Sequence, residues 1–137
     1  SADISSAYVS LSNQYMHEEL NYGRDKLYAI SGRVNPWDWT HGDRRGWPGH
    51  TNVAVDLANT LSANPKLHVM LNSGLFDLAT PYFAAEWTMD HLGVPKQVRS
   101  QITEAEYMSG HMIYVHVPSL AQFKANVSAF IDRTSGL

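Results

Sequence analysis

The chain contains no cysteine, which excludes disulfide bonds, thiol nucleophiles and thiolate metal ligands. It also has no apolar run near the roughly 18 residues that a membrane-spanning helix needs, and no charged-then-apolar export signal at its start. The chain also has no large excess of positive or of negative charge, because the formal net charge is only −3. We therefore expect neither nucleic acid nor a membrane surface as a partner.

Hydrophobic residues make up 44% of the 137 residues, which predicts one globular domain with a single core. Histidine is well represented, and a metal site is the obvious alternative to weigh. The seven histidines are His17, His41, His50, His68, His91, His111 and His116. They form no HExxH motif and have no paired acidic motif or cysteine beside them, so we expect no metal and no other cofactor.

Apolar spacing predicts helices that alternate with strands. The predicted helices are residues 4–20, 52–62, 81–92 and 118–133, with one further turn in 95–100, and the predicted strands begin at residues 67 and 102, with a short extended segment at 26–31. This order implies parallel strands joined by crossover helices, which is the α/β class. Two strands are too few for a stable parallel sheet, so we expect the chain to be part of a larger one.

Residues 34–49 are irregular and rich in tryptophan, which predicts a long ordered loop. Trp37, Trp39 and Trp47 either fix this loop to the core or line a substrate cleft. The Arg44-Arg45 pair is expected at a solvated loop tip, with contact to a substrate carboxylate as the alternative.

Asp77 follows the first strand, in the sequence GLFDLATP. Gly74 is expected to allow backbone angles that a side chain forbids, and Thr80 and Pro81 resemble an N-cap and a first helical position. Asp77 is therefore predicted at the carboxyl end of a strand, where α/β sheets usually carry their sites. Taken alone, an aspartate at this position more often belongs to an Asx-type turn or a cap, because aspartate is common in turns.

His111 follows the second strand, in the sequence SGHMIYVH. On its own it could be a loop histidine bonded to a carbonyl, and the nearby His116 is expected to be structural. The order of acid before histidine, one after each of two successive strands, is that of an α/β-hydrolase triad. We therefore expect the Asp77 carboxylate to orient the imidazole of His111, which acts as general base.

Two extended motifs carry a family resemblance. GLFDLATPYFAAEWT and SGHMIYVHVPSL resemble the acid and histidine motifs of serine carboxypeptidases of the α/β-hydrolase clan, and VNPWDWTHG resembles their bacterial-type members. The resemblance implies that residues 1–137 are a single partial domain, the C-terminal third of such an enzyme. It further implies release of single residues from peptide carboxyl ends through an acyl-enzyme, and a periplasmic or secreted location. By the same resemblance Met112 helps to line the pocket for the leaving residue, although it could simply be a core residue, as could Tyr107 and Tyr114.

The chain departs from that family at the nucleophile, because no glycine pair brackets a serine as G-x-S-x-G. The serine and the oxyanion donors are expected in an upstream segment, so the chain alone is predicted to be inactive. Its expected partners are that segment, a peptide substrate and a second copy of itself. Two alternatives remain open: a noncatalytic self-associating module, and a hydrolase that acts on esters or in acyl transfer.

Overall fold

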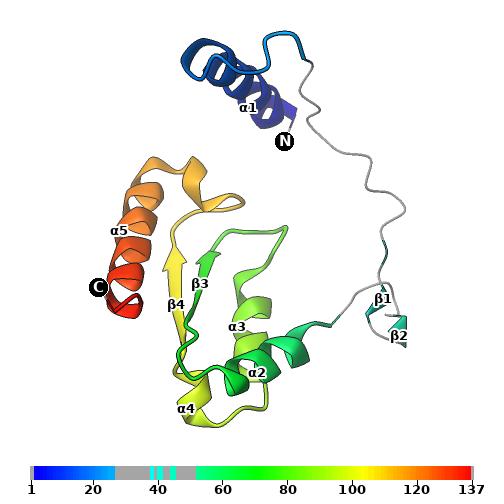
Figure 1. Ribbon diagram of the computed structural model, residues 1–137, viewed down its shortest axis with the longest axis vertical. Helices are drawn as coiled ribbons and strands as arrows, with labels where there is room; N and C mark the ends of the chain where they lie inside the picture. Colours follow the sequence, from blue (N-terminus) through cyan, green and yellow to red (C-terminus); the bar gives the residue numbers. More distant parts are fainter. Residues whose placement is uncertain (1, 27–37, 39, 42–43, 46–51, 137) are drawn as a thin grey trace. The chain divides into compact units, whose positions relative to one another are not determined.

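The computed structural model describes residues 2–26, 38, 40–41, 44–45 and 52–136 (Figure 1). The chain divides into two compact units, Ser1–Thr40 and His41–Leu137, and each is described by itself. The assignment of the whole chain to one partial domain stays a prediction. The expected strand at 26–31 and the three tryptophans of the irregular segment lie outside the described residues, apart from Lys26.

The first unit contains helix α1 (Ala2–Gln14), which continues directly into a π-helical turn, η1 (Tyr15–Glu19). The predicted helix over residues 4–20 is confirmed. It ends where Asn21 adopts a positive φ of 49°, a left-handed conformation that asparagine tolerates better than most residues.

From residue 40 onward, helices and strands alternate as expected. The elements are β1 (Thr40–His41), β2 (Arg44–Arg45), α2 (Ala54–Ala63), β3 (Val69–Gly74), α3 (Tyr82–Asp90), α4 (Lys96–Arg99), β4 (Ile102–Tyr107), η2 (Ile113–Val115) and α5 (Val117–Thr134). The two-residue strands β1 and β2 pair with each other. The predicted helices of this part are confirmed within a few residues, and β4 has the predicted bounds.

Strands β3 and β4 form a two-stranded parallel sheet, with Val69 opposite Ile102 and Gly74 opposite Tyr107. Helix α5 covers one face of the sheet and α3 lies on the other side, while α4 lies at the end of the sheet where β4 begins (Figure 1). The structure is thus of the mixed α/β kind, with parallel strands and flanking helices. In the described part of the chain, each strand has one edge without a neighbour.

Tyr107 joins both strands to α5. Its side chain is only 1% exposed and meets Phe123 of α5 edge-on, with ring centroids 5.8 Å apart. The Tyr107 hydroxyl donates to Asn72 Oδ1 of β3 at 2.9 Å and accepts from Asn126 Nδ2 of α5 at 3.2 Å. Because Tyr107 is buried and both asparagines are half-buried, these hydrogen bonds satisfy polar atoms that have lost part of their contact with water.

On the opposite face of β4, the buried Ile102 is followed by two carboxylates, Glu104 and Glu106. Arg99 of α4 bridges Glu104 of β4 and Asp90 at the end of α3. Burial and the adjacent Glu106 raise the pKa of Glu86 on α3. Charged side chains of this kind are typical of a strand at the edge of a sheet, whereas β3, with Val69, Met70 and Leu71, has the composition of a covered strand.

The hydrophobic core is small. Four hydrophobic residues of the described part are buried, namely Ala58, Leu61, Ile102 and Tyr107. Apolar spacing predicts a buried stripe on α3, made of Tyr82, Ala85, Met89 and Leu92, and these side chains are only half-buried. On α5 the spacing predicts a face of Leu120, Phe123, Val127 and either Phe130 or Ile131. The prediction is wrong at Leu120, which is exposed, whereas Phe123, Val127 and Phe130 are half-buried. The apolar face of a helix stays partly exposed when too few other elements are present to cover it. No helix among the described residues is long and apolar enough to cross a bilayer.

Candidate functional site

The segments that follow β3 and β4 stay paired beyond the sheet. Leu75 N donates to Tyr107 O and Phe76 N donates to Ser109 O, each at 3.0 Å. A methyl group on Gly74 would lie 2.7 Å from Ser109 O and 2.9 Å from the carbonyl oxygen of Gly110. Glycine is therefore required at position 74 by this close approach of two backbones. The expectation that Gly74 needs unusual backbone angles is wrong, since its φ is not positive.

The Asp77 carboxylate is held by its own loop. Its Oδ1 accepts from the backbone N–H groups of Ala79 at 2.9 Å and Thr80 at 2.8 Å. Its Oδ2 accepts from the Thr80 hydroxyl at 2.7 Å and from His111 Nδ1 at 2.9 Å. The side chain is 9% exposed, so these four donors replace most of the water that a free carboxylate would bind.

Thr80 has a different role from the one its position suggests. The N-cap of α3 is Pro81, and no side chain caps this helix. Thr80 lies one residue earlier, and both its backbone N–H and its hydroxyl donate to Asp77. The prediction that Thr80 is the N-cap is therefore wrong. The hydroxyl of Thr80 makes a charge-assisted hydrogen bond to the Asp77 carboxylate, which is stronger than the neutral hydrogen bond that an N-cap makes with a helix N–H group.

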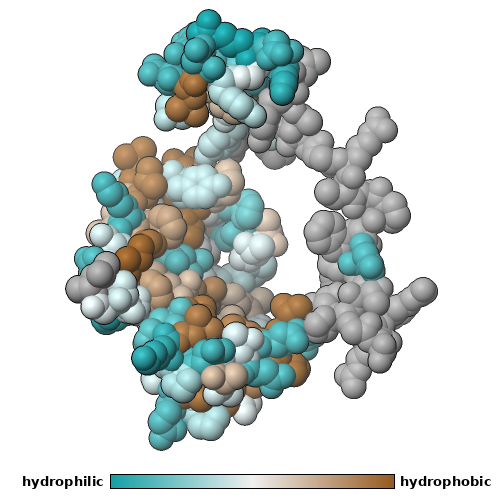
Figure 2. Space-filling model, in the orientation of Figure 1, coloured by the Kyte–Doolittle hydropathy of each residue, from teal (hydrophilic) through white to brown (hydrophobic). Residues whose placement is uncertain are grey.

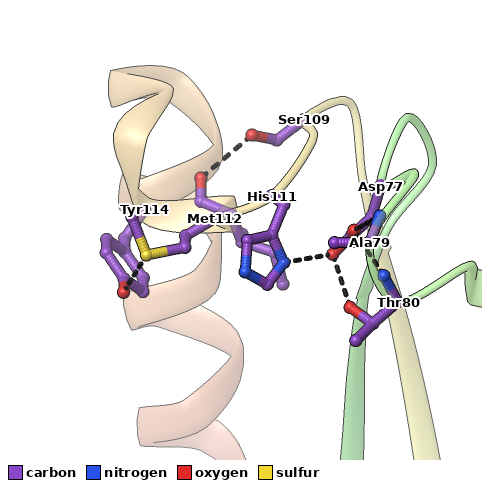
Figure 3. Close-up of polar contacts among 8 residues, drawn as sticks. Asp77, Ala79, Thr80, Ser109, His111, Met112 and Tyr114 are labelled. Atoms are coloured by element: carbon purple, nitrogen blue, oxygen red, sulfur yellow. Dashed lines mark hydrogen bonds and ion pairs between the residues drawn. The ribbon is translucent and has the colours of Figure 1, made fainter. Parts of the chain in front are cut away.

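His111 presents one ring nitrogen to Asp77 and the other away from it (Figure 3). An ionised carboxylate can only accept, so Nδ1 carries the hydrogen and the neutral ring has its lone pair on Nε2. The side chain is 53% exposed, in contrast to that of Asp77, and no described residue bonds Nε2. The predicted partners therefore lie together in the orientation that general-base chemistry at Nε2 requires.

The hydrogen bonds to Asp77 also set its charge. The backbone N–H of Thr80 contributes most, and the Thr80 hydroxyl, His111 and Ala79 add to it. Together they hold the pKa of the Asp77 carboxyl well below its usual range, although burial acts in the opposite direction. Asp77 is thus a permanent anion at neutral pH, as an acid that orients a histidine has to be.

This depressed pKa predicts how stability depends on pH. Below a pH of about 4 the unfolded chain takes up a proton at Asp77 and the folded chain does not, so the free energy of unfolding falls as the pH is lowered. Asp77→Asn is expected to remove the part of this fall in the free energy of unfolding that comes from Asp77. Urea unfolding followed by circular dichroism between pH 2.5 and 6 measures it, with Asp132→Asn on α5 as the control for one lost charge. An unchanged slope in Asp77→Asn would contradict the prediction.

Met112 lies beside His111, and its thioether is fixed by a neighbour. The hydroxyl of Tyr114 donates to Met112 Sδ at 2.6 Å (Figure 3). Met112 is half-buried and Tyr114 is exposed, so neither is a core residue. His116, in contrast, lies at the start of α5 with Nδ1 2.8 Å from the hydroxyl of the buried Ser119, in agreement with the structural role predicted for it.

Several apolar side chains near the pair in the sequence are exposed. They come from the segments that follow both strands and from the start of α5, and comprise Phe76, Leu78, Met108, Tyr114, Val115 and Val117. Figure 2 shows hydrophobic surface over α5 and the segment before it. We call these six residues the apolar rim. Large apolar side chains exposed in this number are typical of a surface that another polypeptide covers.

The described residues contain no cluster of three or more histidine or acidic side chains that could hold a metal ion. Two contributors to the site were missed in the sequence: the hydroxyl of Thr80 and the contact of Tyr114 with Met112. The D-x-x-T spacing of residues 77 and 80 is a signal for the first, since the hydroxyl of a threonine three residues after an aspartate can donate to its carboxylate in an Asx-type turn.

Comparisons with protein-family models, with curated proteins and with solved structures returned no match.

Proposed function

We propose that this chain is the acid and histidine portion of a serine carboxypeptidase with an α/β-hydrolase fold, and that its nucleophile belongs to another segment. The observation that carries the proposal is the contact of 2.9 Å between His111 Nδ1 and Asp77 Oδ2, at the carboxyl ends of two neighbouring parallel strands. The motif resemblance and the order of acid before histidine support it.

In the proposed reaction, Nε2 of His111 takes the proton from a serine hydroxyl while the serine oxygen attacks the carbonyl carbon of the last peptide bond. The imidazolium then gives this proton to the departing amine, which leaves an acyl-enzyme. Water repeats the two steps and releases the shortened peptide. Asp77 remains ionised throughout and stabilises the cation that forms on His111. Met112 contacts the leaving residue from the side of the imidazole.

The missing groups explain why this chain should be inactive by itself. Its sequence has no G-x-S-x-G serine, and a base without a nucleophile accelerates hydrolysis little. We expect no covalent labelling of the 137-residue chain by a serine-directed fluorophosphonate, as measured by intact mass. The complete enzyme should be labelled once, at a serine outside these residues, and should cleave blocked dipeptides in preference to simple esters. Stoichiometric labelling of the isolated chain would rule the proposal out.

A second function is favoured by the surface. The apolar rim and the edge of β3 that has no neighbouring strand among the described residues are groups that a second copy of the chain could cover, which would make the isolated chain a self-associating module. Light scattering over a range of concentrations tests this. A mass of one chain at high concentration would exclude self-association and leave the upstream segment as the partner of these surfaces.

A further inference from the structure

The two oxygens of Asp77 differ in what fixes them. Oδ1 is held by two backbone N–H groups, of Ala79 and Thr80, and these persist whatever the side chain at position 80. Oδ2, the oxygen that faces His111, has no backbone donor among the described residues. Within the part of the chain that the structure describes, its one partner besides the imidazole is the hydroxyl of Thr80, at 2.7 Å.

We propose that Thr80 is a positioning residue, whose hydroxyl fixes Oδ2 of Asp77 and thereby the ring of His111. The two donors to Oδ1 fix the torsion about the bond between Cβ and Cγ, so the Thr80 hydroxyl acts on Oδ2 itself. The hydroxyl occupies one lone pair of Oδ2 and leaves the other directed at Nδ1 of His111. Without the hydroxyl, the ring of His111 can shift between the lone pairs of Oδ2. The consequence for catalysis rests on the proposed function, while the effect on the imidazole does not.

The place of Thr80 allows this role to be tested cleanly. Its side chain is exposed, so a change there opens no cavity in the core. Valine has nearly the shape of threonine, keeps the branch at Cβ and lacks only the donor. Serine keeps the donor and loses the methyl group. Thr88 of α3 offers a matched control, because its hydroxyl donates at 2.7 Å to a backbone carbonyl, that of Ala84, away from the site.

The first measurement is made on the 137-residue chain and needs no turnover. The ¹⁵N shifts of the His111 ring, recorded at a pH of about 8.5 where an ordinary imidazole is neutral, report which nitrogen carries the hydrogen. We expect the Nδ1–H form in the wild type and in Thr80→Ser, and a mixture of both forms in Thr80→Val. Thr80→Ala serves as a second variant without the hydroxyl, and Thr88→Val should match the wild type.

The second measurement is made on the complete enzyme. Thr80→Val is expected to lower kcat about 10- to 100-fold, the range for loss of one hydrogen bond to a charged group, and to leave KM nearly unchanged, because the hydroxyl touches Asp77 and no substrate. Thr80→Ser should restore kcat.

A single Nδ1–H form in both Thr80→Val and Thr80→Ala would overturn the role of Thr80, whatever the enzyme does. Wild-type turnover in His111→Ala would instead overturn the proposed function and leave the spectroscopic result standing. The two failures are therefore distinguishable.

Discussion

Replacement of His111 by alanine in the complete enzyme is expected to lower kcat by about 10⁶-fold, and Asp77→Asn by about 10⁴-fold. The first change removes the base that accepts the serine proton. The second keeps the shape of Asp77 but puts an amide where Oδ2 accepts from Nδ1, so the ring is no longer held in the tautomer with a free Nε2. Steady-state and single-turnover kinetics with a blocked dipeptide measure both effects.

A double-mutant cycle makes this prediction sharper. Because Asp77 acts only through His111, the double variant should be no slower than His111→Ala alone. His68→Ala, at an exposed histidine before β3, is the matched control and should keep wild-type turnover. Full additivity of the two losses would show that the residues act separately, and the paired role would then be wrong.

Tyr107→Ala is expected to destabilise the second unit by about 3–5 kcal/mol, the cost of removing a large buried aromatic side chain. The change leaves a cavity beside Phe123 and removes the hydroxyl from between Asn72 and Asn126. A domain this small is expected near the lower limit of the usual 5–15 kcal/mol, so most of its stability would be lost.

The matched variant Tyr107→Phe separates packing from hydrogen bonding. It keeps the ring and should cost about 0.5–1.5 kcal/mol, because the half-buried amide groups of Asn72 and Asn126 then lose this hydrogen-bond partner. Urea unfolding followed by circular dichroism provides both values. Equal losses in the two variants would mean that the hydroxyl network, and not the packing of the ring, holds α5 to the sheet.

The elements could be predicted from the sequence because their signals are local. The apolar run before Gly74 and the alternation in β4 each indicate a strand within a few residues, and Pro118 near the start of α5 fits a fixed helical φ. The meeting of Asp77 and His111 followed from topology, since the carboxyl ends of adjacent parallel strands share one edge.

The details that were missed depend on distant partners. Thr80 next to Pro81 satisfies the local rule for a cap, yet the carboxylate of Asp77 takes its hydroxyl. Gly74 is required by a backbone 35 residues later in the chain. Gln101 is similar: its Nε2 donates at 2.8 Å to the carbonyls of Asn64 and Leu67, which fastens the end of α2 to the start of β4. No window of a dozen residues contains both members of such pairs.

The close crossing at Gly74 has a consequence for how a reaction centre could be completed. Backbone hydrogen bonds on both sides of the crossing bind the two site-bearing segments into one rigid piece, so the acid and the base have already lost their relative freedom. When the centre assembles, only the incoming serine hydroxyl then has to be immobilised. The entropy cost of assembly therefore comes from one side chain instead of three. The effective concentration of the base would be set almost wholly by how firmly the serine-bearing polypeptide is seated.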